Sequence, residues 1–353
     1  MKLAIFYRET IPTLFMLEKA AKDAGFEIHL FHLKDIHLCA ETSGLELYVN
    51  NISLKDFSAV FVRGFWDFQD EVAVIARFCK QNKIALFDSA LYSQHIISKI
   101  DDLLAFQSVG LPIIKTLFLS ATCDVKMIEK ELSFPIVTKE NRSRKGQDVF
   151  LLRNSEELKD FIDKIKSDDK TLDTKMYQFQ KFIPADYDLR VIVLGGEVLG
   201  TIKRQSVDPH EFRHNVSLGG TATKVEISQE MKEMAIKAAK SMNYELAGVD
   251  LITDKNTGET FVLEINRSPG FEGFMAATGI DLPAELMKFF LATLAKGWHP
   301  PLRAWPAPLG HGTRPLGLAF PWQTPKIGAS DHLLCFIYGP STKNWNPYFY
   351  ITG

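Results

Sequence analysis

Short apolar segments alternate with segments of helical periodicity along the first 95 residues. In chain order these segments are Leu3–Tyr7, Thr13–Ala24, Glu27–Phe31, Ala59–Arg63, Glu71–Gln81 and Ile84–Phe87. Alternation of strands and helices predicts a parallel sheet with crossover helices on its faces. No GxGxxG sequence follows the first strand, so the dinucleotide fingerprint is absent. We therefore expect residues 1–95 to form a small α/β domain that holds no nicotinamide cofactor.

The composition excludes several classes of protein. The chain has 353 residues, of which 46% are hydrophobic and 24% charged, as in a soluble globular protein of two or three units. Its net charge of -2 gives no electrostatic basis for nucleic-acid binding. No apolar run reaches the roughly 18 to 20 residues that span a bilayer. The N-terminal apolar segment is too short for a secretory signal.

The cysteines indicate a reducing compartment. Cys39, Cys79, Cys123 and Cys335 are scattered and form no CxxC pair, which fits reduced thiols better than a disulfide framework or a zinc site. We therefore expect a cytoplasmic protein with no nucleic-acid or membrane partner, and a homo-oligomer is compatible with the sequence.

The middle of the chain predicts two further groups of elements. Between residues 96 and 175 the predicted elements are Lys99–Val109, Lys115–Leu119, Val125–Leu132, Pro135–Lys139, Val149–Leu152 and Ser155–Lys166, the first, third and last of them helices. Between residues 176 and 296 the predicted strands are Tyr177–Gln180, Arg190–Leu194, Val198–Lys203, Gly248–Thr253 and Thr260–Asn266, and the predicted helices are Gln229–Met242 and Leu282–Lys296. Gly195–Gly196 indicates a hairpin turn between two of these strands.

Residues 297–353 differ from the rest of the chain. This segment holds nine of the 16 prolines and four of the five tryptophans, and periodicity is nearly absent. It is either a Pro-rich interaction tail or a segment outside the evolved domain, such as out-of-frame translation. The abrupt change in composition favours the second interpretation.

Two predicted strands near the end carry the strongest chemical signal. Asp250 interrupts the apolar strand AGVDLIT, and Glu264 and Asn266 lie two residues apart in FVLEIN, so that they face the same side of a strand. If the two strands pair, three oxygen-bearing side chains converge, as a Mg²⁺ site requires. The alternative is a satisfied buried acid next to a turn. The Glu-x-Asn on the second strand favours the metal.

Basic residues supply further candidates. Lys139 ends an apolar strand beside a polar, Gly-containing stretch, which suits phosphate binding, although a solvated lysine would show the same pattern. Arg204 ends a strand, and Arg213 and Asn215 lie before the flexible turn at residues 217–220. Arginine suits bidentate contact with carboxylate or phosphate, but isolated arginines are most often solvated surface charges.

In this order and spacing, the pieces resemble the RimK-like ATP-grasp ligases. The similarity is clearest from about Tyr177 to Phe289, in the blocks FIPADYDLRVIVLGGEVLG, FRHNVSLGGTA, MNYELAGVDLI, VLEINRSPGFEGF and ATGID, and it extends more loosely back to Lys99. The resemblance implies an α/β (α+β) chain in which an ATP-grasp fold follows a small Rossmann-like domain. Residues 96–175 would be the lid subdomain and residues 176–296 the subdomain with the metal site.

The resemblance also implies roles for individual residues. Lys99 and Lys139 would contact the ATP phosphates, and Lys181 and Phe182 would form the hinge that holds adenine. Asp188 would bind ribose. Arg213 and Asn215 would lie near the phosphates and the acyl group. The concentration of basic residues near the Gly–Gly turn separately predicts that Arg204 helps Arg213 to hold the carboxylate substrate or its acyl phosphate. The metal, Mg²⁺ or Mn²⁺ in its place, would be held by Asp250, Glu264 and Asn266.

Two departures from the family pattern bear on ATP binding. The loop after Lys139 is usually richer in glycine, and here residues 140–148 keep only Gly146 and carry three basic residues. The hinge position occupied by Lys181 is usually acidic. The implied reaction is nevertheless that of the family: a carboxylate attacks the γ-phosphoryl group, and an amine then attacks the acyl phosphate. Glutamate is the first candidate amino acid, and a nucleotide-binding module with decayed activity is the alternative.

Overall fold

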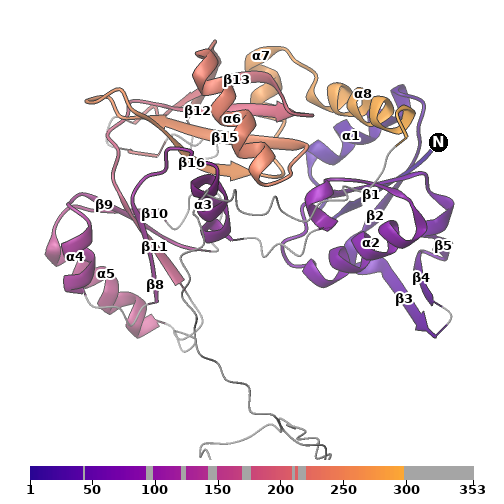
Figure 1. The fold of residues 1–353 in the computed structure, drawn as a ribbon, viewed down its shortest axis with the longest axis horizontal. Coiled ribbons are helices and arrows are strands. Elements are labelled where there is room, and N and C mark those ends of the chain that lie inside the picture. Colours follow the sequence, from indigo (N-terminus) through magenta and orange to yellow (C-terminus); the bar gives the residue numbers. More distant parts are fainter. Residues whose placement is uncertain are drawn as a thin grey trace, which may run out of the picture. The chain divides into compact units, whose positions relative to one another are not determined.

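The first domain is a parallel sheet with helices on both faces (Figure 1). The computed structural model describes residues 1–42, 44–92, 98–120, 125–141, 149–168, 176–208, 211–213 and 220–297. Four strands, in the order β2-β1-β6-β7, form the sheet: β1 (Lys2–Tyr7), β2 (Glu27–His32), β6 (Ala59–Arg63) and β7 (Ala85–Phe87). This confirms the parallel sheet that the alternation of strands and helices predicts.

Side-chain alternation along β1 divides the core of this domain into two layers. Leu3 and Ile5 pack with α1 (Pro12–Asp23) and with α8 (Leu282–Ala295) from the C-terminal part of the described chain. Ala4 and Phe6 pack with α2 (Gln69–Asn82) on the opposite face. Because neighbouring residues of a strand face opposite sides, one short apolar strand supplies both layers.

A small antiparallel sheet within the first 95 residues was not predicted. It contains β3 (Ile36–Glu41), β4 (Gly44–Val49) and β5 (Ile52–Ser53). Short 3-10 helices precede β3 at Leu33–Asp35 and follow β5 at Leu54–Asp56, and a third follows β7 at Ser89–Tyr92. Every β3 residue after Ile36 is exposed. A strand exposed on both faces has no alternation of buried and exposed side chains, so the hydrophobic pattern gives no signal for it.

The second sheet belongs to the predicted lid. Its strands, in the order β10-β9-β11-β8, are β8 (Thr116–Ser120), β9 (Ile136–Glu140), β10 (Val149–Leu152) and β11 (Met176–Lys181), and the helices α4 (Val125–Glu131) and α5 (Ser155–Asp168) accompany it. A separate apolar core fills this part of the chain. Strand β11 follows the predicted boundary after residue 175, yet it pairs with β8 and β9.

The third sheet carries the predicted metal residues. Its strands, in the order β14-β13-β12-β15-β16, are β12 (Asp188–Leu194), β13 (Glu197–Gln205), β14 (Thr221–Lys224), β15 (Leu246–Thr253) and β16 (Thr260–Asn266). Helices α3 (Lys99–Ser108) and α6 (Gln229–Ser241) share one apolar core with this sheet, and α7 (Glu272–Thr278) follows β16. The predicted turn at Gly195–Gly196 is present, with φ values of 61° and 86° that favour glycine.

Two further predictions concern the chain as a whole. Among the residues that the structure describes, no helix is both long and apolar enough to cross a membrane. The Pro- and Trp-rich tail, from residue 298 onward, lies outside the described residues. Its assignment therefore stays a prediction.

A half-buried carboxylate, that of Glu245, joins the first sheet to the third. Both oxygens of Glu245 accept hydrogen bonds from the backbone N–H of Ser89, at 3.1 and 2.9 Å. Burial, with a smaller contribution from the nearby charge of Asp88, raises the pKa of Glu245 to about 7. The folded protein therefore binds the proton of Glu245 more tightly than the unfolded chain does.

This pKa predicts a stability that depends on pH. A carboxyl pKa that is higher in the folded state than in the unfolded state lowers the free energy of unfolding as pH rises from about 4.5 to about 7, by up to about 3 kcal/mol. Glu245→Gln is expected to remove this dependence and to be more stable than the parent at pH 8. Denaturant midpoints between pH 5 and pH 8 measure it. Parallel curves for the two proteins would contradict the prediction.

Candidate active site

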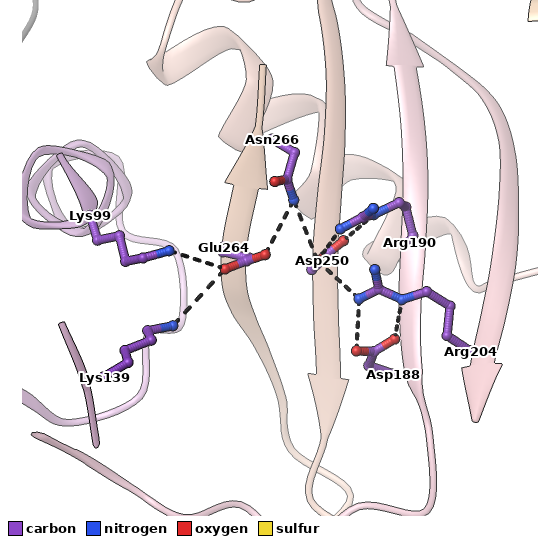
Figure 2. A network of polar contacts seen from close by, with 8 residues as sticks. All are labelled: Lys99, Lys139, Asp188, Arg190, Arg204, Asp250, Glu264 and Asn266. Atoms are coloured by element: carbon purple, nitrogen blue, oxygen red, sulfur yellow. Dashed lines mark hydrogen bonds and ion pairs between the residues drawn. The ribbon is translucent and has the colours of Figure 1, made fainter. Parts of the chain in front are cut away.

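Two paired strands bring the predicted metal residues together (Figure 2). In the antiparallel pair of β15 and β16, Asp250 lies opposite Glu264 and Gly248 lies opposite Asn266. The Asn266 amide Nδ2 donates to Glu264 Oε1 at 3.3 Å and approaches Asp250 Oδ2 at 3.5 Å. The convergence expected from the two-residue spacing of Glu264 and Asn266 is therefore present.

Two lysines from outside this sheet point at Glu264. The Lys99 ammonium, from the first residue of α3, lies 3.6 Å from Glu264 Oε2, and the Lys139 ammonium, from β9, lies 4.0 Å from the same atom. Burial, and next the charge of Lys99, lower the pKa of Lys139 to about 8. Burial alone would raise the pKa of Glu264, but the neighbouring lysines and arginines hold it well below its usual range. An anionic ligand would relieve the repulsion between the lysines.

Two arginines, from β12 and β13, bind Asp250 and Asp188 on the same face of the sheet. Arg190 makes a bidentate pair with Asp250, with both N···O distances at 2.7 Å. Arg204 donates to both oxygens of Asp188, at 2.6 and 2.7 Å, and to Asp250 Oδ2 at 2.9 Å. Sequence reasoning did not include Arg190 among the site residues. The signal was present, because Asp188 and Arg190 lie two residues apart on one strand and so share a face.

These residues line a cleft of about 800 Å³. The predicted hinge residues Lys181 and Phe182 line it as well, together with the apolar side chains Ile114, Val137, Ile183, Ile252 and Leu263. The hinge N–H groups donate to the carbonyls of Lys115 and Pro135, so both are occupied within the protein. A cleft with apolar walls and a few converging polar groups is typical of small-molecule sites.

The predicted arginine and asparagine near the acyl group differ in what the structure shows. Arg213 lines the cleft, and its guanidinium makes a bidentate pair with Glu211 at 2.8 and 2.6 Å. Asn215 and the loop glycine Gly146 lie outside the described residues. Their predicted roles stay predictions.

The candidate metal ligands are too few to hold a metal ion by themselves, but they suit Mg²⁺ that is also bound by a phosphate. No group of three or more His, Cys, Asp or Glu side chains that could hold a metal occurs in the described part of the chain. Asp250 and Glu264 would offer carboxylate oxygens, although both Asp250 oxygens accept from arginines, and Asn266, which turns its Nδ2 toward the two acids, would have to offer its amide oxygen. Mg²⁺ is commonly held by one or two carboxylates together with substrate phosphates. The set is therefore adequate only when a phosphate ligand completes it.

The residues of the network in Figure 2 all lie in a region that matches a known protein family. Residues 98–290 match the model of the RimK-like ATP-grasp domain. The chain belongs to the RimK-like ATP-grasp family. It is therefore an ATP-dependent ligase of the class that forms carbon–nitrogen bonds.

Relatives of similar length accompany this match. A protein of Trichodesmium erythraeum named "Probable alpha-L-glutamate ligase" is 28% identical over 309 residues, which are 84% of this chain and 98% of the relative. A protein of the same name from Picosynechococcus is 28% identical over 311 residues, covering 84% and 97%. Both matches span most of this chain and nearly the whole length of each relative.

Solved structures of ATP-grasp ligases share the fold. PsnB, complexed with a phosphomimetic variant of its minimal precursor, Mg and ADP, aligns with a TM-score of 0.63 at 18% identity, over 83% of this chain and 98% of PsnB. The macrocyclase MdnC of Microcystis aeruginosa, bound with the precursor peptide MdnA, aligns with a TM-score of 0.60 at 18% identity, over 83% and 100%. At these identities the likeness shows the fold alone.

Proposed function

We propose that this ligase joins an amino acid, with glutamate as the first candidate, to a peptide, protein or small-molecule acceptor through an acyl phosphate. The observation that carries the proposal is the network in Figure 2, in which three carboxylates, an amide and four cationic side chains converge on one cleft. Charges arranged in this way can stabilise phosphoryl transfer. The names of the relatives support glutamate as the amino acid.

The proposed roles are those that the resemblance to the family implies. Lys99 and Lys139 would hold ATP phosphates, and Asp188 together with the hinge residues Lys181 and Phe182 would hold the nucleoside. Asp250, Glu264 and Asn266 would hold Mg²⁺, or Mn²⁺, which offsets charge on the phosphates when bound. Asn141 also lines the cleft, and its buried Oδ1 has no hydrogen-bond partner among the described residues. A buried acceptor of this kind is suited to a ligand donor.

The reaction would proceed in two displacements. A carboxylate oxygen of one substrate attacks the γ-phosphorus of ATP, and the bond to the β–γ bridging oxygen breaks with release of ADP. The amine nitrogen of the second substrate then attacks the acyl carbon. The carbon–oxygen bond to phosphate breaks, and inorganic phosphate leaves with the electron pair. The lysines and arginines provide positive charge that holds two anions close together.

A substrate screen tests this proposal. ADP release and amide formation would be measured with glutamate, other amino acids and simple amines, each with a panel of carboxylates. We expect amide product in proportion to ADP, with glutamate among the active amines. ATP hydrolysis without amide from any amine would contradict the ligase proposal. No turnover at all would favour the nucleotide-binding module with decayed activity.

Arg213 offers a specific prediction for the acyl step. A guanidinium can contact carboxylate or phosphoryl oxygens through two parallel hydrogen bonds, which an ammonium cannot. Arg213→Lys is therefore expected to lower kcat/KM by about 10-fold or more with little change in thermal stability. Steady-state kinetics of ADP release measures the effect. An unchanged kcat/KM would remove Arg213 from the proposed site.

A further inference from the structure

Glu272 differs from the paired acids of the cleft in its partners. Asp188, Asp250 and Glu264, which line the cleft, each have an arginine or lysine nitrogen within hydrogen-bonding or ion-pair distance. Glu272 also lines the cleft, and its side chain is exposed. Among the described residues its carboxylate accepts a hydrogen bond from the neutral Thr13 hydroxyl, at 3.0 Å, and lies in no ion pair. Its charge acts on the buried Arg63 guanidinium without forming an ion pair with it, so the carboxylate can still bind a ligand.

The position of Glu272 is that of a ligand-binding group in an α/β domain. In open parallel sheets, ligands bind beyond the carboxyl ends of the strands, where the strand order reverses. Here the order β2-β1-β6-β7 reverses between β1 and β6. Thr13 lies near the start of the helix that follows β1, and Gly64, Phe65 and Trp66, which follow β6, line the same cleft as Glu272. The hydrogen bond to Thr13 thus holds Glu272 at this crevice.

Two arginines lie near Glu272. Arg63 senses the charge of Glu272 but makes no ion pair with it, and its Nη1 is buried without a hydrogen-bond partner among the described residues. Arg63, the last residue of β6, is buried, and its guanidinium donates to the carbonyl of Pro269. Arg267 lines the cleft, but it is ion-paired with Asp88 and stacks with the rings of Phe65 and Tyr244. This end of the cleft therefore combines an exposed carboxylate with aromatic side chains. That chemistry recognises a cation better than an anion.

We propose that Glu272 binds the ammonium group of the amine substrate and takes its proton before the amine attacks. The inference rests on the proposed ligase function. Proton transfer from the ammonium to the carboxylate leaves a neutral amine with a lone pair. The nitrogen attacks the acyl carbon, the carbon–oxygen bond to phosphate breaks, and the second nitrogen proton leaves with the phosphate. Glu272 then returns its proton to water.

A comparison of two nucleophiles, an amino acid and hydroxylamine, distinguishes binding of the ammonium group by Glu272 from a merely structural role. An amino acid enters as an ammonium ion, whereas hydroxylamine is largely uncharged near neutral pH and traps an acyl phosphate as a hydroxamate. In the full-length protein, Glu272→Gln is expected to raise the KM for the amino acid by 10-fold or more. Hydroxamate formation and the KM for ATP should stay within about threefold of the parent, because neither needs the carboxylate.

Three variants sharpen the comparison. Glu285→Gln removes a carboxylate that pairs with Lys288 on the surface of α8, and it should leave both reactions unchanged. Thr13→Val removes the hydroxyl that orients Glu272 and should raise the amino-acid KM by a smaller factor. Asp102→Asn tests the other cleft carboxylate without an ion pair among the described residues, whose pKa burial raises to about 7. It should leave the amino-acid KM unchanged.

The outcomes distinguish this inference from the ligase proposal. The inference is supported if the amino-acid KM rises in Glu272→Gln, rises by a smaller factor in Thr13→Val, and is unchanged in Glu285→Gln and Asp102→Asn. Equal loss of amide and hydroxamate, or an unchanged amino-acid KM, overturns the role of Glu272. A rise in amino-acid KM in Asp102→Asn in place of Glu272→Gln also overturns it. If the parent forms no hydroxamate with any carboxylate tested, the ligase proposal itself fails, and the inference fails with it.

Discussion

Glu264→Gln is expected to lower ligase turnover by about 100-fold or more, with the largest loss at limiting Mg²⁺. The substitution keeps the shape of the side chain and removes the charge that faces Asn266 and Asp250. In the structure, Glu264 also lies within 4.0 Å of the Lys99 and Lys139 ammonium groups. Its loss releases both lysines from their ion pair. Binding of ATP without metal should therefore be unchanged or tighter while turnover falls.

Loss of turnover without loss of ATP binding would identify Glu264 as a metal ligand. The measurement is the Mg²⁺ dependence of ADP release, together with the affinity for ATP in a chelator. The matched control is Glu259→Gln, which removes an exposed carboxylate from the turn that joins the same two strands. Activity within a few-fold of the parent at limiting Mg²⁺ would contradict the assignment of Glu264. A parallel loss of activity in the control would point to damage of the hairpin.

The elements with a buried face were predictable from the sequence. The strand Ala59–Arg63 is buried at every position and carries an uninterrupted apolar run, and its predicted bounds agree with β6. Strand β3 and helix α7 were missed for different reasons. All of β3 after Ile36 is exposed, and α7 is only seven residues long and begins without a side-chain cap. Neither leaves a periodic pattern long enough to detect.

The part of the site that depends on residue spacing along a single strand was predictable from the sequence. The shared face of Glu264 and Asn266 follows from their two-residue spacing, and the cross-strand partner Asp250 follows once β15 and β16 pair. Contacts between elements distant in sequence were not predictable. Lys99 and Lys139 reach Glu264 from a helix and from a different sheet, and the motif does not encode these distances.

Arg204 shows the same limit more sharply. The sequence placed it near the acyl group as one of several basic residues. The register between β12 and β13 sets Arg204 opposite Asp188, and its guanidinium donates to Asp188 and Asp250. Without the register, a buried arginine and a solvated one look alike in the sequence. Its contact with the acyl group stays a proposal, and its contact with the two acids leads to a prediction about stability.

Arg204→Met is expected to lower the free energy of unfolding by about 3 to 5 kcal/mol. Only 4% of the Arg204 side chain is exposed, and Asp188 and Asp250 are equally buried. Burial disfavours the charged guanidinium, but the charges of Asp250 and Asp188 outweigh burial and raise the pKa of Arg204 above its usual value. Arg204 is therefore charged at every pH of interest. Its loss leaves Asp188 without this partner, whereas Asp250 keeps Arg190.

The unequal effect on the two acids makes the prediction testable by a double-mutant cycle. Because Asp188 is the acid that loses its bidentate partner, Asp188→Asn should recover much of the stability lost in Arg204→Met. Asp250→Asn should recover less, since Arg190 still pairs with Asp250. Denaturant unfolding of the single and double variants gives the coupling energies, and Lys203→Met, from the adjacent position on β13, is the matched control. If Arg204→Met were as stable as the parent, the guanidinium would not be stabilising the two acids. Equal recovery by both asparagine variants would mean that Arg190 does not hold Asp250 independently.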